Sequence, residues 1–245
     1  MDIFGWSVER KRALSAYLRT FLTPERSALM QRVLAERTRH VTVVVEDIYQ
    51  PHNASAVLRS CEIFGIQDVH AIENRNAFRP NGEVAMGAEK WVDVHPWNTA
   101  SSDNTASCLA ALREKGYQIA VTALRDDSIP LGDVPLDRPL AFVFGAEERG
   151  VTETALSMAD MVVRIPMHGF TQSFNISVSV ALCLYDLTTR LRASDVPWRL
   201  DVSAHADVEL AWCLKSLARN EEYIRRFLQD EGAATAGPSG CSLPG

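Results

Sequence analysis

Three segments of this 245-residue chain contain polar side chains and glycines in patterns that a loop joining two elements does not need. The first is PHNASAVLRSCEIFGI, at 51–66. It predicts a helix that Asn53 can cap at its start and that Gly65 can end in the left-handed conformation. These two structural roles leave Arg59 unexplained on an otherwise apolar helix. Arg59 either forms an intrahelical ion pair with Glu62, three residues further on, or is available to act on a substrate.

The other two segments are FGAEERGVT, at 144–152, and IPMHGFTQSFNISVSVALCLYDL, at 165–187. In the former, Gly145 would allow the backbone to approach a ligand closely, whereas the acidic residues beside it would ordinarily lie on the surface of a turn. In the latter, either Ser173 or Asn175 can cap the long apolar helix that follows. Capping explains one of these two residues but not both.

The common cofactor and metal motifs are missing from the sequence. It contains neither GxGxxG after a strand nor GxxxxGK[ST], which disfavours a dinucleotide-dependent oxidoreductase and a methyltransferase of the ordinary Rossmann kind. The six histidines form no HExxH-type site, so we expect no catalytic metal. The five cysteines are scattered without a CxxC pair, which argues against structural zinc and a disulfide framework and fits a reducing cytosol.

Alternating strands and helices must position these segments. Short β-branched runs alternate with helical stretches from residue 41 onward, which predicts an α/β fold with a mostly parallel sheet and helices on both faces. In such sheets, ligands bind in the loops beyond the carboxyl ends of the strands. The expected strands are 41–46, 68–72, 91–94, 118–122, 140–145 and 161–165, and the expected helices are 54–64, 104–115, 152–157 and 174–192.

Helical extensions flank this core. Thr23 followed by a proline and an acid predicts the start of a helix that runs to about Arg39, and another helix is expected over 7–22. A last helix is expected over 208–228. We therefore divide the chain into an N-terminal extension, an α/β core, a C-terminal extension and a disordered tail, at 1–40, 41–192, 193–230 and 231–245.

Composition and charge narrow the class of protein. Hydrophobic residues make up 47% and charged residues 23% of the chain, which is enough for a folded core. No apolar run is long enough to span a membrane or to form a secretory signal, so we expect a cytoplasmic protein. Residues 1–40 carry eight Lys or Arg against four acids, whereas residues 41–189 carry ten against nineteen. A basic arm thus precedes an acidic core.

The three segments together resemble the three motifs of the SpoU family of RNA ribose 2′-O-methyltransferases, in the SPOUT superfamily. The matching residues are Asn53, Arg59 and Gly65, then Gly145, Glu147 and Gly150, then Ile165, Pro166, Met167, Gly169, Ser173 and Asn175. This resemblance implies a deep trefoil knot at the carboxyl end of the sheet, which is an exception to the rule against threaded chains. It also implies S-adenosyl-L-methionine as cofactor and a homodimer whose active site borrows residues across the interface.

The resemblance also implies residue roles. The expected catalytic residues are Arg59, Asn53, Glu147, Ser173 and Asn175, and the expected cofactor-binding residues are Thr122, Gly145, Ile165, Met167 and Phe174. In the family, the matching arginine is assigned the role of general base, although a guanidinium, which keeps its proton at neutral pH, is better suited to holding a phosphate and stabilising an alkoxide. Phe174 stands where the family usually has leucine, which we expect to reshape the cofactor pocket.

The flanking helices resemble those of the branch of this family that methylates a guanosine in the D-loop of tRNA. The basic helices are accordingly expected to bind tRNA phosphates through Arg26, Arg32, Arg37, Arg39, Lys215, Arg219, Arg225 and Arg226. The role of residues 1–22, which lengthen the usual N-terminus, stays open. So do three alternatives, namely methylation of another tRNA or rRNA nucleoside, a non-catalytic RNA-binding protein of the same fold, and a nucleotide-dependent oxidoreductase.

Overall fold

The computed structural model describes residues 2–100, 102–147, 149–171 and 173–235, and the chain divides into two compact units. Residues 36–199 form the sheet unit, which carries the three motif segments. Residues up to 35 and from 200 onward form the helical unit. The N-terminal and C-terminal extensions therefore pack together, although they lie at opposite ends of the sequence.

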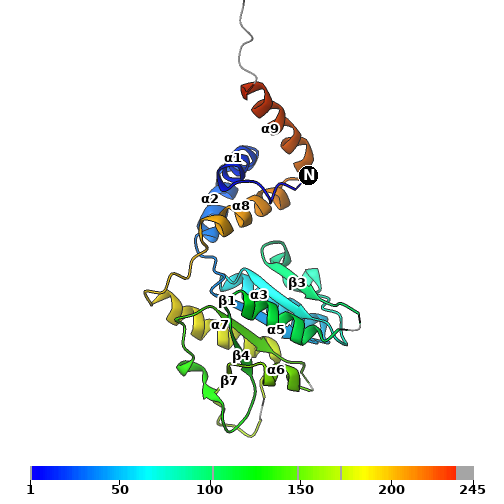
Figure 1. Ribbon diagram of the computed structural model, residues 1–245, viewed down its shortest axis with the longest axis vertical. Coiled ribbons are helices and arrows are strands. Elements are labelled where there is room, and N and C mark those ends of the chain that lie inside the picture. Colours follow the sequence, from blue (N-terminus) through cyan, green and yellow to red (C-terminus); the bar gives the residue numbers. More distant parts are fainter. Residues whose placement is uncertain (1, 101, 148, 172, 236–245) are drawn as a thin grey trace, which may run out of the picture. The chain divides into compact units, whose positions relative to one another are not determined.

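The sheet unit is built on a parallel sheet with the strand order β3-β2-β1-β6-β4-β7-β5 (Figure 1). Each of its strand pairs is parallel, which confirms the α/β fold expected from the alternation of strands and helices. The strands are β1 (Val41–Glu46), β2 (Asp68–Ile72), β3 (Asp93–Trp97), β4 (Gln118–Thr122), β5 (Ile129–Pro130), β6 (Leu140–Phe144) and β7 (Met161–Arg164).

Helices cover both faces of this sheet (Figure 1). Because side chains alternate along a strand, Val43 of β1 packs in one apolar cluster and Val44 in the other. The first cluster includes residues of α3 (Pro51–Ile63) and α7 (Ile176–Arg192). The second cluster includes residues of α5 (Asn104–Glu114) and α6 (Glu153–Ser157). Burial on both sides explains why β1 is apolar almost throughout.

Some elements of the sheet unit differ from the expected ones. The structure adds the short α4 (Gly82–Ala85), η1 (Ala88–Lys90) and η2 (Leu131–Asp133), besides β5. Strand β3 begins two residues later than expected and runs three residues further. Trp91 donates its N–H to Ala88 and thereby closes the η1 turn, so the strand starts only where the N–H of Asp93 reaches the carbonyl of Gln67.

The helical unit contains α1 (Val8–Arg19), α2 (Pro24–Leu34), α8 (Val202–Ser216) and α9 (Asn220–Thr235). Thr23 caps α2 as expected, its hydroxyl accepting the N–H of Arg26 at 3.2 Å. That helix nevertheless ends at Leu34 rather than near residue 39. The single helix expected over 208–228 is two helices, because Leu217 adopts an extended conformation between them. The expected tail begins inside α9, and residues 236–245 lie outside the described part.

Helix α1 packs against both C-terminal helices, which gives residues 1–22 a structural role. Tyr17 of α1 contacts Phe227 of α9, and Phe21, just after the end of α1, contacts Tyr223 of α9, with ring centroids 5.6 and 4.2 Å apart. Lys11 is 5% exposed and pairs with Asp207 of α8 at 2.7 Å, and Arg10, Arg19 and Glu231 join further pairs within the unit. Much of the basic charge of the arm is therefore neutralised inside the unit.

Candidate functional site

A cleft lies at the carboxyl ends of β4, β6 and β7, where the fold places ligands. The structure brings the five expected cofactor residues together in its lining, which includes Thr122, Gly145, Ile165, Met167 and Phe174. Leu124 and Arg164 also line the cleft and were missed. Arg164 ends β7 and Leu124 lies two residues after the end of β4, so the strand-end rule alone could have found them.

The chemistry of this lining suits a ligand that has an apolar, flat part. Leu124 and Phe174 are 56% and 42% exposed, which is high for large apolar side chains next to a core. Thr122 is held in place because its hydroxyl donates to the carbonyl of Val143 at 3.0 Å. The cleft therefore offers apolar walls and backbone groups, and Glu147 and Arg164 supply charge at its edge.

Glycine is required at position 145 by the protein's own backbone and not by the close approach of a ligand. A Cβ at this position would overlap the backbone of Gly150 and Val151. The loop folds back on itself because Ala146 and Gly150 exchange two backbone hydrogen bonds, of 3.0 and 2.8 Å. The explanation from sequence was therefore wrong about what lies against Gly145, although the residue does line the cleft.

Three of the expected catalytic residues form a hydrogen-bonded cluster beside the cleft. The amide of Asn53 donates to Glu147 Oε1 at 2.6 Å, and Asn175 Nδ2 donates to Asn53 Oδ1 at 3.1 Å. Asn175 also caps α7 by accepting the N–H of Ser177 at 2.8 Å. The cluster thus joins one residue from each of the three motif segments.

Asn53 does not cap the helix, which corrects the prediction made from sequence. Helix α3 begins at Pro51 with Gln50 at the cap position, so Asn53 lies inside the first turn. It is 3% exposed, and its side chain points to Glu147 and Asn175 instead of to the helix backbone. Gly65, by contrast, has a φ of 80° after the end of α3, as expected for a residue that ends a helix in the left-handed conformation.

Ser173 and Arg59 lie outside this cluster. Ser173 lines the neighbouring cleft. Arg59 is exposed on α3 and makes no hydrogen bond or ion pair with the residues that the structure describes. Its expected alternative partner, Glu62, instead accepts a hydrogen bond from Arg37 at 3.2 Å. The structural explanation of Arg59 as an intrahelical ion pair is therefore wrong.

Arg37 cannot bind a tRNA phosphate from its place in the structure, which corrects another expectation. Because α2 ends at Leu34, Arg37 is on the segment that enters the sheet unit, and its side chain is fully buried. Its guanidinium donates to the carbonyl of Ile66 at 3.1 Å, besides the bond to Glu62. Burial lowers the pKa of Arg37, and the nearby Glu62 charge opposes that shift.

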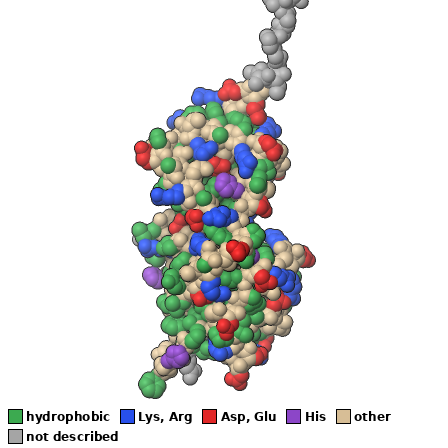
Figure 2. All heavy atoms as spheres, turned by 90° about the vertical axis from the view of Figure 1, so that its left-hand side faces the viewer, with side chains coloured by type: hydrophobic (Ala, Val, Ile, Leu, Met, Phe, Trp, Pro, Cys, Tyr) green, Lys and Arg blue, Asp and Glu red, His purple; other side chains and the backbone are tan. Residues whose placement is uncertain are grey.

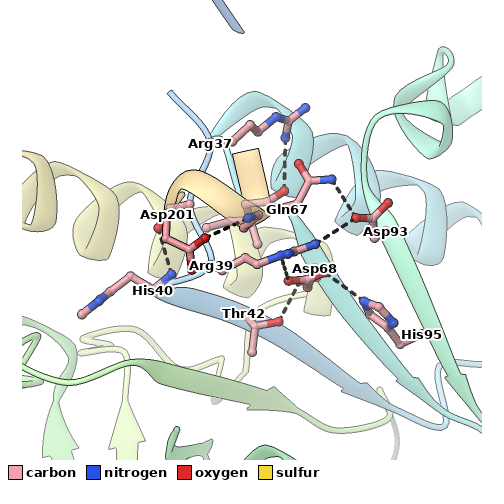
Figure 3. A network of polar contacts seen from close by, with 12 residues as sticks. Arg37, Arg39, His40, Thr42, Gln67, Asp68, Asp93, His95 and Asp201 are labelled. Atoms are coloured by element: carbon pink, nitrogen blue, oxygen red, sulfur yellow. Dashed lines mark hydrogen bonds and ion pairs between the residues drawn. The ribbon is translucent and has the colours of Figure 1, made fainter. Parts of the chain in front are cut away.

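Arg39 forms ion pairs with carboxylates at the edge of the sheet. Figure 3 shows it between Asp68 and Asp93, and its distances to these carboxylates are 2.8 and 3.4 Å. His95 also hydrogen-bonds Asp68, at 2.9 Å. Burial raises the pKa of Asp68, but the His95 hydrogen bond and the Arg39 charge together bring it below its ordinary value. Arg39 is therefore half-buried and paired.

The other expected RNA-binding residues lie at the surface of the helical unit. Exposed side chains belong to Arg26, Arg32, Lys215, Arg219, Arg225 and Arg226. Among them, Arg219 lies 4.0 Å from Glu222. The unit as a whole has ten Lys or Arg against ten Asp or Glu, whereas the sheet unit has fifteen against twenty-one. The helical unit therefore has no excess of basic charge, and its arginines stand out only by their exposure.

No metal site is found within the described part of the chain. It contains no group of three or more His, Cys, Asp or Glu side chains that could hold an ion. The cysteines in it are free and buried, at Cys61, Cys108, Cys183 and Cys213. None of its helices is long and apolar enough to cross a membrane.

The chain is similar to known tRNA-modifying enzymes over most of its length. A protein 36% identical over 211 residues is the tRNA (guanosine(18)-2′-O)-methyltransferase of Borreliella burgdorferi, with 86% of this chain and 94% of that protein covered. The enzyme of the same description from Thermus thermophilus is 36% identical, with 79% and 98% covered. A crystal structure described as the A. aeolicus TrmH/SpoU tRNA modifying enzyme matches with a TM-score of 0.69 and 26% identity, over 80% of this chain and 98% of that one.

The family comparison covers the first two motif segments and all but the last two residues of the third. The model of the SpoU rRNA Methylase family matches residues 40–185, from the start of β1 into α7. This range holds the cleft and the cluster of Asn53, Glu147 and Asn175. Because more than half of the chain matches, the protein belongs to the SpoU methylase family.

Proposed function

We propose that this protein transfers a methyl group from S-adenosyl-L-methionine to the ribose 2′-hydroxyl of a guanosine in tRNA, at position 18 of the D-loop. The observation that carries this proposal is the contact of Asn53 with both Glu147 and Asn175 beside the cleft. The relatives named above are described as guanosine-18 enzymes and are covered almost over their full lengths.

The cleft fits S-adenosyl-L-methionine by its chemistry. The cofactor has no phosphate, so the absence of a glycine-rich phosphate loop in the sequence is consistent with it. Ile165, Met167 and Phe174 would hold its apolar part, with Thr122 and Gly145 beside them. When bound, this cofactor supplies a methyl group that is already activated for transfer. The protein then has to align the ribose oxygen and manage its proton.

Asn53, Glu147 and Asn175 would orient the ribose, because their amide and carboxylate groups are fixed by one another. Ser173, at the edge of the cleft, would help to hold the RNA backbone. Arg59 would bind the phosphate next to the reacting ribose and stabilise the alkoxide as it forms. A guanidinium keeps its proton at neutral pH, so the hydroxyl proton passes to phosphate or water.

We further propose a homodimer in which Arg59 serves the cleft of the partner. Arg59 and Ile63 lie one turn apart on the exposed face of α3, and Ile63 is 65% exposed. On α7, the helix that packs beside α3, Val178 and Tyr185 are 44% and 63% exposed. Figure 2 shows hydrophobic side chains on the face of the sheet unit where α7 lies. A second copy covering this apolar face would also account for the unpaired state of Arg59.

A mixed dimer tests this arrangement. Arg59→Ala and Asn175→Asp should each lower methyl transfer by about 100-fold or more as homodimers. Aspartate keeps the cap on α7 but cannot donate to Asn53. A mixed dimer, isolated through two different affinity tags, should recover about half of the wild-type rate, since one of its two sites is complete. A mixed dimer as inactive as its parents would place Arg59 in the cleft of its own subunit.

The trefoil knot of the superfamily is also part of this proposal. The segment after β7 lines the same cleft as the ends of β4 and β6, which is where such a knot would lie. Docking of tRNA would use the exposed arginines of the helical unit, and Arg39 would contribute only by giving up its carboxylate partners. A cytoplasmic location stays a prediction.

The reaction itself is tested by supplying methyl-labelled cofactor and an unmodified tRNA transcript. Alkaline hydrolysis cannot cut next to a methylated 2′-oxygen, so the label should appear in a dinucleotide. Label in a mononucleotide would mean methylation of a base. Cofactor binding without any transfer to RNA would instead support a non-catalytic RNA-binding protein.

A further inference from the structure

A second cavity of about 870 Å³ opens beside the cleft, and the cofactor assignment does not use it. Ala146, Glu147 and Gly150 line both spaces, so the loop after β6 forms a wall between them. Since Glu147 belongs to the polar cluster, anything held in the second cavity lies next to that cluster. The other lining residues include Glu46, Asp47, Tyr49, Gln50, Arg75, Asn76, Arg149, Thr152 and Glu153.

Two acidic residues of this cavity hold its walls in place. Glu46 is 1% exposed and accepts two hydrogen bonds of 2.8 Å from the backbone and hydroxyl of Thr152, as well as one from Thr105. Asp47 adopts a φ of 54°, and its carboxylate accepts the N–H of Arg75 at 2.8 Å. Both carboxylates are therefore satisfied by the protein, and the loops around the cavity are fixed before any ligand arrives.

Other side chains in the lining are not held by hydrogen bonds or ion pairs of this kind. Tyr49 is 74% exposed, an unusual state for an aromatic residue that follows a buried strand. The side chains of Arg75, Arg149 and Glu153 make no hydrogen bond or ion pair with described residues. The cavity thus offers an aromatic surface, two guanidinium groups and one carboxylate.

This set of groups matches the edges of guanine. Guanine presents O6 and N7 as neighbouring acceptors, which a guanidinium binds with two hydrogen bonds. Its N1–H and N2 amino group are neighbouring donors, which a carboxylate can accept. An aromatic side chain provides a stacking surface for any base. Adenine and the pyrimidines lack this combination of paired donors and paired acceptors.

We propose that this second cavity binds the guanine base of the nucleoside whose ribose is methylated. Tyr49 stacks on the base, Glu153 accepts its N1–H and N2 amino group, and Arg75 or Arg149 donates to O6 and N7. The inference rests on the proposed function and adds to it the residues that select guanosine. The base in this cavity places its ribose beside Glu147, where the polar cluster joins the cleft.

Glu153→Gln tests the choice of base on full-length protein with two tRNA transcripts, one with guanosine and one with inosine at the target position. Inosine lacks only the N2 amino group. The wild-type protein should prefer guanosine by about 10-fold or more in kcat/KM, because a charged acceptor would lose its partner. Glu153→Gln should bring this preference to within about threefold. An unchanged preference in the variant would overturn the assignment of Glu153.

Tyr49 and Arg75 test the cavity itself. Tyr49→Ala should raise KM for tRNA by roughly 5- to 100-fold, whereas Tyr49→Phe, which keeps the ring, should stay within about twofold of wild type. Arg75→Ala should lower kcat/KM about 10-fold or more, and Arg79→Ala is its matched control because Arg79 is exposed outside the lining.

The outcomes separate this inference from the proposed function. Wild-type protein that fails to methylate tRNA would contradict the proposed function. Wild-type activity together with fully active Tyr49→Ala and Arg75→Ala would contradict only the guanine site. Loss of activity in those variants with the guanosine preference unchanged in Glu153→Gln would show that a different nucleotide occupies the cavity.

Discussion

His70 is buried in β2 as a neutral imidazole. It is 5% exposed, and Trp97 donates its indole N–H to His70 Nδ1 at 3.2 Å. Burial lowers the pKa of His70 from 6.5 to about 4, and the stacked His95 ring adds to this effect. The folded protein therefore binds a proton at His70 less readily than the unfolded chain does.

This shift predicts a loss of stability in mild acid. The contribution of His70 is complete above pH 6.5, and it falls as the pH drops towards 4, because only the unfolded chain is then protonated at this residue. The full effect is roughly 3 kcal/mol. Urea unfolding at pH 7.5 and at pH 5 measures the free energy of unfolding at each pH. Between these two values it should fall less for His70→Gln than for the wild type. An equal fall in both proteins would contradict a neutral, buried His70.

Single residues also show where the sequence is ambiguous. A polar residue near a helix start is most often a cap, yet Asn53 is inside the helix and bridges to Glu147 and Asn175. Its partners are about 90 and 120 positions away in the chain, and no local pattern encodes such a pairing. Arg37 was mistaken for a surface residue for the same reason, since its partner Glu62 is on another element.

At the scale of the elements, the loop after β6 depends on Gly145. A Cβ there would overlap the backbone of Gly150 and Val151, which no side-chain movement can relieve. Gly145→Ala should therefore lower the free energy of unfolding by about 3 kcal/mol or more and weaken cofactor binding. Gly132→Ala is the matched control, because a Cβ at Gly132 meets nothing within 4 Å.

Chemical denaturation and calorimetry of the two variants decide this point. Gly132→Ala should stay within about 1 kcal/mol of the wild type. If Gly145→Ala were equally stable and bound S-adenosyl-L-methionine normally, the loop would not need its close backbone contact.

The central strands and most of the helices were predictable from sequence because their signals are local. The β-branched runs of β1, β2, β4 and β6 begin at the expected residues. The ends of elements were less predictable where a tertiary contact sets them. Leu217 separates α8 from α9 without glycine or proline, and Asn220 donates to the carbonyl of Leu214 across the break. The start of β3 likewise depends on pairing with β2.

At the scale of the whole molecule, the distribution of charge changes how RNA docking should be tested. Helix α1 packs on α8 and α9, so deleting residues 1–40 would expose apolar surface as well as remove charge. Point variants that keep the fold are better. The double variant Arg26→Gln and Arg32→Gln removes two exposed charges from α2.

This double variant should weaken tRNA binding and flatten its dependence on salt. Each lost phosphate contact should reduce the slope of log K against log salt by about 0.7 to 0.9. Arg79→Gln with Arg138→Gln removes the same charge from exposed positions of the sheet unit and should leave the slope nearly unchanged. Equal slopes for the two double variants would exclude α2 from the RNA-binding surface.

We propose that the cluster of Asn53, Glu147 and Asn175 beside the cleft directs methylation to the ribose of a tRNA guanosine. Nucleoside mass spectrometry tests it most directly, on an unmodified tRNA transcript incubated with the wild-type protein and S-adenosyl-L-methionine. The predicted product is 2′-O-methylguanosine, mapped by nuclease fragments to guanosine 18, and it should be lost in Asn175→Asp. A methylated base, a methyl group on another nucleoside, or an unmodified tRNA in the presence of bound cofactor would contradict the claim.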